Sequence, residues 1–223
     1  RDGGTSGCVE AGAFGKEAYI LTGYFNLPKM LELALHDGID PRSGRRLGPA
    51  TGDPREFGRF DDLFEAWRAQ LRHFVEIKYR GNLVIERRWA EEMPAPFLSV
   101  LTADCIARGR DYNTGGARYN TSYIQGVGIG SLTDCLSALD HQVYQGTLAM
   151  AEVLQALDAD FEGREALRVR LASTTPRYGN DDDRADELMV RAFEAFHAEV
   201  DGRPNLRGGT YHIDMLPTTC HVY

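Results

Sequence analysis

Apolar side chains recur at helical spacing through much of the chain. The longest such pattern covers residues 61–93, where apolar positions return every three or four residues. It predicts one helix of about 30 residues, which is long for a globular protein. A shorter helix is expected to begin after Asn26, because Asn is a favoured N-cap and Pro28 fits the first helical turn. Asp37 and Gly38 are expected to end it.

Other segments alternate between helical patterns and turn chemistry. Asp-Pro, Ser-Gly and Gly-Asp-Pro sequences predict a loop at 39–58, and residues 210–213 are predicted to form a strand. The first 15 residues are rich in Gly and small side chains, so we expect irregular backbone there. Residues 111–130 are rich in Gly and Tyr, and such segments carry function more often than helices do. Further helices are predicted at 97–107, 132–144, 149–157, 164–171 and 183–200.

The composition narrows the class of protein. At 223 residues and 43% hydrophobic, the chain can build one sizeable core. It has 25 Lys and Arg against 33 Asp and Glu, for a net charge of -8, and this balance disfavours nucleic-acid binding. No apolar run is long enough to span a membrane, so we expect a soluble cytoplasmic protein. The ends carry no initiator Met and interrupt loops, which predicts a piece of a longer polypeptide.

The four cysteines are spaced too far apart for a zinc site or an iron-sulfur cluster. They are therefore expected to be reduced thiols. Cys105 and Cys135 lie within apolar helical patterns and are expected to be small buried side chains. The three consecutive carboxylates Asp181 to Asp183 follow a Gly-Asn pair, so we expect them to cap the next helix and not to bind metal.

Cys8-Val9-Glu10 is the segment with the clearest chemistry. In extended backbone, the thiol and the carboxyl two residues on point to the same side. A nucleophilic thiolate needs a nearby base, and no His precedes His36. A radical cysteine needs a neutral S–H, and a carboxyl held protonated beside it can donate to a leaving hydroxyl and then take back a proton. From spacing alone, a structural Cys next to an exposed Glu remains an open alternative.

Short segments with turn residues follow one another along the chain. They are Thr5-Ser6-Gly7-Cys8-Val9-Glu10, Leu21-Thr22-Gly23-Tyr24-Phe25-Asn26, Asp37-Gly38-Ile39-Asp40-Pro41, Thr51-Gly52-Asp53-Pro54, Asp111-Tyr112-Asn113, Gly115-Gly116-Ala117-Arg118-Tyr119-Asn120, Tyr178-Gly179-Asn180-Asp181-Asp182 and Arg207-Gly208-Gly209-Thr210-Tyr211. Their residues and their order resemble the glycyl radical enzymes of the pyruvate formate-lyase-like superfamily. This resemblance covers nearly the whole chain.

The resemblance implies an α/β fold, in which the chain is a helix-rich fragment of a ten-stranded α/β barrel with the cysteine loop inside. Residues 1–223 would then be an internal part of one catalytic domain, without its N-terminal part and its C-terminal glycyl radical loop. Cys-x-Glu, in place of two adjacent cysteines, is the form found in the dehydratases, in the trimethylamine and sulfite lyases and in some arylacetate decarboxylases. Residues 10–17 and 215–223 are most similar to the trans-4-hydroxy-L-proline dehydratases.

By this resemblance, Cys8 and Glu10 are the catalytic residues and Tyr24 and Thr219 line the substrate site. The reaction would remove water from hydroxyproline to give 1-pyrroline-5-carboxylate in anaerobic metabolism. No metal or bound cofactor is expected in this chain, because the radical would be installed on a glycine outside it by a radical S-adenosylmethionine activase. The substrate would be a small molecule, and the full-length enzyme would be a homodimer.

Three alternatives stay open at this point. Another Cys-x-Glu glycyl radical lyase, such as a diol dehydratase, a choline trimethylamine-lyase or a decarboxylase, would share Cys8 and Glu10. A Cys-His hydrolase or transferase would instead require a reactive thiolate at Cys8. The chain alone is also expected to be an inactive structural fragment, because no turnover is predicted without the rest of the barrel.

Overall fold

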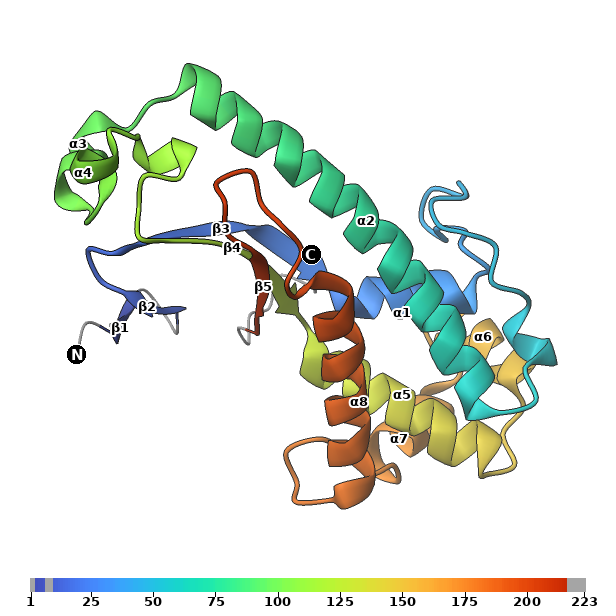
Figure 1. Ribbon diagram of the computed structural model, residues 1–223. Helices are drawn as coiled ribbons and strands as arrows, with labels where there is room; N and C mark the ends of the chain where they lie inside the picture. The colour runs from blue at the N-terminus through green and yellow to red at the C-terminus, as the bar shows by residue number, and fades with distance from the viewer. Residues whose placement is uncertain (1–2, 7–9, 216–223) are drawn as a thin grey trace. The chain divides into compact units, whose positions relative to one another are not determined.

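The computed structural model describes residues 3–6 and 10–215 (Figure 1). They form an α/β structure, as the sequence predicts, and divide into two compact units. The first unit, called here the sheet unit, comprises residues 3–6 and 10–25, Val75–Val127 and residues 196–215. The second, the helical unit, comprises Asn26–Phe74 and Gly128–Ala195.

The sheet unit begins with an antiparallel pair of short strands, β1 (Gly3–Ser6) and β2 (Glu10–Ala13). The expectation of irregular backbone at the start of the chain is therefore wrong. Gly4 and Gly12 are register partners, and a Cβ added at Gly4 would lie 2.5 Å from the ring of Phe14. Glycine at this position leaves room for the ring of Phe14, and a sequence pattern does not distinguish that use from a flexible loop.

A three-stranded sheet forms the rest of the β structure, in the order β3-β4-β5. The strands are β3 (Glu17–Asn26), β4 (Tyr119–Val127) and β5 (Tyr211–Asp214). β4 and β5 are parallel, with Ser122 opposite Tyr211 and Gln125 opposite Asp214. The predicted strand at 210–213 is confirmed within one residue. β3 and β4 were not predicted from the sequence.

One long helix, α2 (Phe60–Glu92, 33 residues), confirms the longest helical pattern in the sequence (Figure 1). After it, the helix predicted at 97–107 is in fact two short helices, α3 (Pro96–Leu101) and α4 (Cys105–Arg108). The interruption falls at Asp104, whose φ of 77° is incompatible with a continuous helix. Cys105 is buried as expected, against Ala18 and Ala117.

In the helical unit, α1 (Leu27–Leu35) begins as predicted, with the side chain of Asn26 accepting a 3.0 Å hydrogen bond from the backbone N–H of Lys29. Trp67 is fully buried in the core of this unit, and its indole N–H donates to the carbonyl of Leu27 at 3.4 Å. The other helices are α5 (Ile129–Leu139), a π-helical continuation (Asp140–Tyr144), α6 (Met150–Asp158), α7 (Glu165–Ser173) and α8 (Asp183–Val200).

Two smaller expectations in the helical unit have different outcomes. Asp182 caps α8, because its carboxylate accepts the N–H of Arg184 at 3.1 Å. Cys135 is exposed, so its expected burial is wrong. The predicted loop at 39–58 is present and contains one 3₁₀ turn, Pro54–Glu56. Among the described residues, no helix is long and apolar enough to cross a membrane.

Candidate active site

The hairpin of β1 and β2 carries the predicted catalytic segment. Ser6 and Glu10 are register partners at its end, and Cys8 lies between them in the sequence. Cys8 and Thr219 fall outside the described residues, as does the side chain of Glu10. The roles proposed for these three residues, and the same-side arrangement of thiol and carboxyl, therefore stay predictions.

Glu17 joins the hairpin to the sheet. One oxygen of its carboxylate accepts the backbone N–H of Ala13 at 2.9 Å, and the other accepts the hydroxyl of Thr121 on β4. A Cβ at Gly12 would lie only 3.0 Å from the same carboxylate. The carboxylate of Glu17 thus links the end of β2 to β4 by charge-assisted hydrogen bonds. Sequence reasoning did not single out Glu17.

Tyr24 is the predicted site residue whose side chain the structure describes. Along β3 the buried positions are Ala18 and Ile20, but further on Phe25 is buried and Tyr24 is 54% exposed. The alternation therefore shifts by one residue, and the shift coincides with Gly23, whose φ is 114°. This break in β3 turns Tyr24 away from the buried face of the strand. Its contact with substrate remains a prediction.

Two tyrosines stack on the face of the sheet opposite to Ala18. The rings of Tyr19 on β3 and Tyr123 on β4 are parallel within 16°, with their centroids 4.1 Å apart. The hydroxyl of Tyr19 donates to Asp214 on β5 at 3.1 Å, so this pair spans all three strands. Burial raises the pKa of Tyr123, which keeps its phenol neutral. Tyr119 and Tyr123 lie at even spacing in the sequence, but this signal was not recognised as a strand.

The other face of the sheet is held by polar side chains of α2. The Lys78 ammonium donates to the carbonyl of Thr22, and the Asn82 amide donates to the hydroxyl of Thr22 at 2.9 Å. That hydroxyl in turn donates to the carbonyl of Tyr123 at 2.8 Å. Four residues on, Glu86 is 2% exposed and continues the same helical face.

Glu86 is the centre of a buried hydrogen-bond network. One carboxylate oxygen accepts the hydroxyls of Ser122 at 2.7 Å and Tyr211 at 2.8 Å, and the other accepts the N–H of Leu206 at 3.0 Å. Burial raises the pKa of Tyr211, and the Glu86 charge beside it acts in the same direction. The phenol therefore stays a hydrogen-bond donor throughout the accessible pH range.

Arg207 extends this network to the edge of β3. Its guanidinium donates to the carbonyls of Ala18 at 3.0 Å and Thr121 at 2.6 Å. The amide of Asn205 donates to the carbonyl of Asn120 at 2.9 Å. Burial lowers the pKa of the Arg207 guanidinium, and an arginine side chain keeps its charge in proteins. Within the Arg-Gly-Gly-Thr-Tyr segment singled out in the sequence, Arg207 and Tyr211 are thus the buried side chains that support the sheet.

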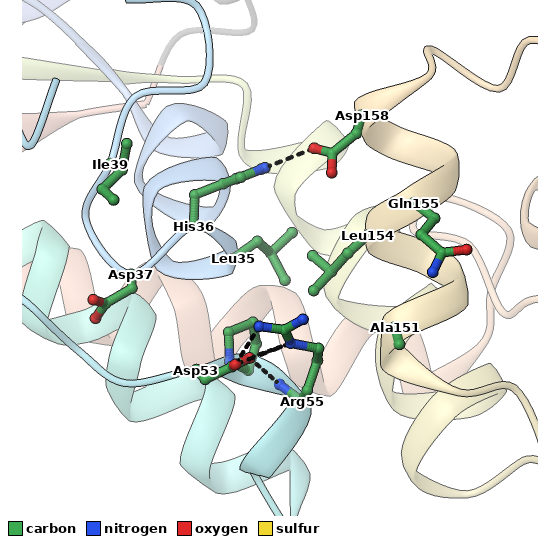
Figure 2. Close-up of a pocket in the computed structure, with 11 residues that line it drawn as sticks. Leu35, His36, Asp37, Ile39, Asp53, Arg55, Ala151, Leu154, Gln155 and Asp158 are labelled. Carbon is green, nitrogen blue, oxygen red and sulfur yellow. Dashed lines mark hydrogen bonds and ion pairs between the residues drawn. The ribbon is translucent and has the colours of Figure 1, made fainter. Parts of the chain in front are cut away.

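A separate open pocket lies in the helical unit (Figure 2). Ionisable side chains that line it already have partners in this unit: a ring nitrogen of His36 lies 3.3 Å from the carboxylate of Asp158, and the carboxylate of Asp53 pairs with the guanidinium of Arg55. Tyr24, the predicted site residue whose side chain is described, does not line it. Within residues 3–6 and 10–215, no group of three or more His, Cys, Asp or Glu side chains is arranged to hold a metal ion.

Comparison with known proteins places this geometry in context. A family model described as pyruvate formate lyase-like matches residues 1–223. The chain is 55% identical over 224 residues to trans-4-hydroxy-L-proline dehydratase of Clostridioides difficile, covering 100% of this chain and 28% of that protein. It is 33% identical over 225 residues to (2S)-3-sulfopropanediol dehydratase of Klebsiella oxytoca, covering 100% of this chain and 27% of that protein.

Solved structures agree with the sequence comparison. The crystal structure of hydroxyproline dehydratase from Clostridioides difficile with trans-4-hydroxy-L-proline bound matches with a TM-score of 0.96 and 55% identity, covering 99% of this chain and 28% of that one. The glycerol-bound B12-independent glycerol dehydratase from Clostridium butyricum matches with a TM-score of 0.89 and 33% identity, over 96% of this chain and 27% of that one. These findings confirm the expected resemblance and the expected fold.

Proposed function

This chain belongs to the pyruvate formate lyase-like family, and we propose that it is an internal part of a glycyl radical dehydratase acting on trans-4-hydroxy-L-proline. The observation that carries the proposal is the 55% identity along the whole chain to a dehydratase of that name, together with the TM-score of 0.96 to its substrate-bound structure. Identity to the sulfopropanediol dehydratase is much lower, at 33%.

The chain spans 28% of the length of the hydroxyproline dehydratase that it matches. We infer that it forms one part of a single catalytic domain and that the rest of the barrel packs against it. Exposed apolar side chains support this inference: α3 has no buried residue, and Phe97 on it is 84% exposed. The glycine that carries the radical, and the N-terminal part of the domain, would lie outside the chain.

The proposed reaction uses Cys8 and Glu10. A glycyl radical outside this chain would supply the initiating radical. Cys8, as a thiyl radical, takes a hydrogen atom from C5 of hydroxyproline, forming S–H and breaking C–H. The C4–O bond then breaks while Glu10 gives its proton to the departing hydroxyl, so that water leaves. Glu10 takes back a proton from the ring nitrogen as C5=N forms.

The cycle closes on the same thiol. The radical now at C4 recovers a hydrogen atom from Cys8, which regenerates the thiyl radical and gives 1-pyrroline-5-carboxylate. Tyr24 would orient the ring, since a tyrosine can donate one hydrogen bond while its apolar face packs on a pyrrolidine. Its exposure on β3 supports this role. Thr219 is proposed as a second contact to the substrate.

The proposed partners follow from the same chemistry. Radical installation requires a radical S-adenosylmethionine activase, and we propose that the full-length enzyme is a homodimer that binds no further cofactor in this chain. The other members of the Cys-x-Glu group differ in substrate and keep the same catalytic pair. A substrate assay therefore distinguishes these alternatives from the proposed function, because all of them use the same radical mechanism.

The test is anaerobic activation of the full-length enzyme with its activase, followed by assay of trans-4-hydroxy-L-proline, propane-1,2-diol and choline. We expect pyrroline carboxylate from hydroxyproline only, and none with Cys8→Ser. Turnover of another substrate would keep the radical mechanism and remove the proposed specificity. An absent glycyl radical signal in the electron paramagnetic resonance spectrum of a verified activation mixture would contradict the radical mechanism itself.

Two further variants separate the roles of individual residues. Glu10→Gln should retain the glycyl radical signal and lower kcat by about 10²- to 10⁴-fold, because it lacks the transferable proton. Tyr24→Phe should lower kcat/KM by about 10-fold, because one hydrogen bond to the substrate is lost. Tyr178→Phe, on a partly exposed tyrosine of the helical unit, is the matched control and should leave kcat/KM unchanged.

A further inference from the structure

We propose that Lys78 is a positioning residue for the substrate site, because it holds the break in β3 that turns Tyr24 out of the buried face. The inference rests on the function proposed above for Tyr24. It concerns a residue on α2 that reaches the site through the backbone of β3 and not through the substrate.

The contact lies directly beside the break. The Lys78 ammonium donates to the carbonyl of Thr22, the residue immediately before Gly23. A Cβ placed on Gly23 would lie 3.2 Å from the same ammonium, so the nitrogen sits against the glycine itself. The positive φ of Gly23, 114°, is the conformation that shifts the alternation of β3. Lys78 therefore contacts the peptide whose orientation decides which side Tyr24 takes.

Neighbouring groups fix Thr22 from two more directions. Its hydroxyl accepts from Asn82 at 2.9 Å and donates to the carbonyl of Tyr123 at 2.8 Å. Asn82 also accepts from the Lys78 ammonium at 3.3 Å. Backbone and side chain of Thr22 are thus both held, one by α2 and the other by α2 and β4. Such a closed set of hydrogen bonds has few alternative arrangements.

Lys78 itself is an unusual choice for this place. It is partly buried, and burial lowers the pKa of its ammonium. Within the described part of the chain, its ammonium donates to a carbonyl and an amide oxygen, and not to a carboxylate. A lysine that serves only solubility keeps its charge in water. Burying an ammonium against a peptide carbonyl costs desolvation free energy and adds little stability. What the contact does provide is a fixed orientation of that peptide.

The experiment uses the full-length activated enzyme with Lys78→Met, Lys78→Arg and Arg88→Met. Arg88 lies on the same helix, and its side chain is 65% exposed, which makes it the matched control. We expect Lys78→Met to lower kcat/KM by about 10- to 100-fold, the effect of a misplacement of roughly 1 Å in a substrate contact. Lys78→Arg keeps a cationic donor and should stay within about threefold of the wild type, as should Arg88→Met.

A double-mutant cycle separates positioning from general damage. If Lys78 acts through Tyr24, Lys78→Met should have less than about a threefold effect in a Tyr24→Ala background, which removes both the hydroxyl and the ring. Fully additive losses would overturn the proposal. The glycyl radical content should be the same in all variants. If the wild type acts on another dehydratase substrate, the proposed function fails but the same ratios are measured with that substrate.

A second readout does not depend on turnover. Amide hydrogen exchange in residues 20–26 should accelerate by about 10-fold or more in Lys78→Met relative to Arg88→Met, because the carbonyl of Thr22 loses its donor. Unchanged exchange would overturn the proposal even in an inactive preparation. Lys78→Gln provides a shorter neutral donor if Lys78→Met is insoluble, and we expect an intermediate exchange rate for it.

Discussion

Adjacent glycines 208 and 209 provide a stringent test of the buried support under the sheet. A Cβ at Gly209 would lie 1.5 Å from the carbonyl oxygen of Asn120, whereas one at Gly208 meets no atom within 4 Å. Gly208 has φ of 85°, so Ala there carries left-handed strain of about 1 to 2 kcal/mol. The two positions look alike in the sequence, but replacing each by alanine costs folding free energy for a different physical reason.

At Gly209 the cost is steric. Ordinary contact begins at 3.4 Å, so the backbones around Gly209 and Asn120 must separate by about 2 Å. That movement breaks the bonds from Asn205 to the carbonyl of Asn120 and from the N–H of Gly209 to Asn205, both 2.9 Å. With about 1 kcal/mol for each bond and about 1 to 3 kcal/mol for overpacking, Gly209→Ala should cost at least about 3 kcal/mol.

Hydrogen exchange measured by mass spectrometry on the full-length protein can resolve this difference. In peptides covering 205–215, Gly209→Ala should accelerate exchange by about 100-fold or more, and Gly208→Ala by about 10-fold. Activity should fall with Gly209→Ala, because β5 leads from this network into the segment that contains Thr219. Equal exchange in the two variants would refute the account of Gly209 as a position of forced close approach.

Two predictions concern the helical unit. The Lys29 ammonium, 2.6 Å from Asp40, holds the pKa of this carboxyl far below its ordinary value. This stabilisation is therefore present at neutral pH and lost as pH falls below about 4, so acid should make the loop at 39–58 more sensitive to protease in the wild type, and Asp40→Asn should remove that dependence. Asp182→Ala removes the cap that accepts the N–H of Arg184, and should destabilise the start of α8 by about 1 kcal/mol, measurable as about fivefold faster exchange there.

The helices were predictable because local sequence determines most of their features. The N-cap at Asn26, the apolar face of α2 around Trp67 and the cap at Asp182 are each encoded within a few residues. The break between α3 and α4 was missed, since nothing in the local pattern announces a positive φ at Asp104. That conformation depends on its tertiary surroundings, including the ion pair between Asp104 and Arg118.

β3 and β4 escaped prediction for a different reason. The inward positions of β4 include Asn120 and Ser122, which are polar and buried, so the alternation of apolar and polar residues is lost. Their partners, Asn205 and Arg207, come from a segment more than 80 residues away. A polar residue can be buried on this face of the sheet only because hydrogen-bond partners from a distant part of the sequence satisfy it.

The candidate site was predictable as far as its chemistry is local. Cys8 and Glu10 lie two residues apart, and family resemblance singled out Tyr24. The supporting residues Lys78 and Glu86 were not found, although they follow Val75 at spacings of three and eleven on the same helical face. A polar residue on the continuation of a buried apolar face is the signal that could have revealed them.

The polar face of α2 has a consequence for the fidelity of folding. Apolar contacts depend little on direction. A helix with a purely apolar face can therefore shift along a sheet at a small cost in free energy. Hydrogen bonds to Glu86, by contrast, form only when Ser122, Tyr211 and Leu206 arrive together. A slip of one residue in β4 or β5 would leave a carboxylate buried without donors, which is a large penalty. The polar face of α2 therefore favours the native register of β4 and β5 over registers shifted by one residue.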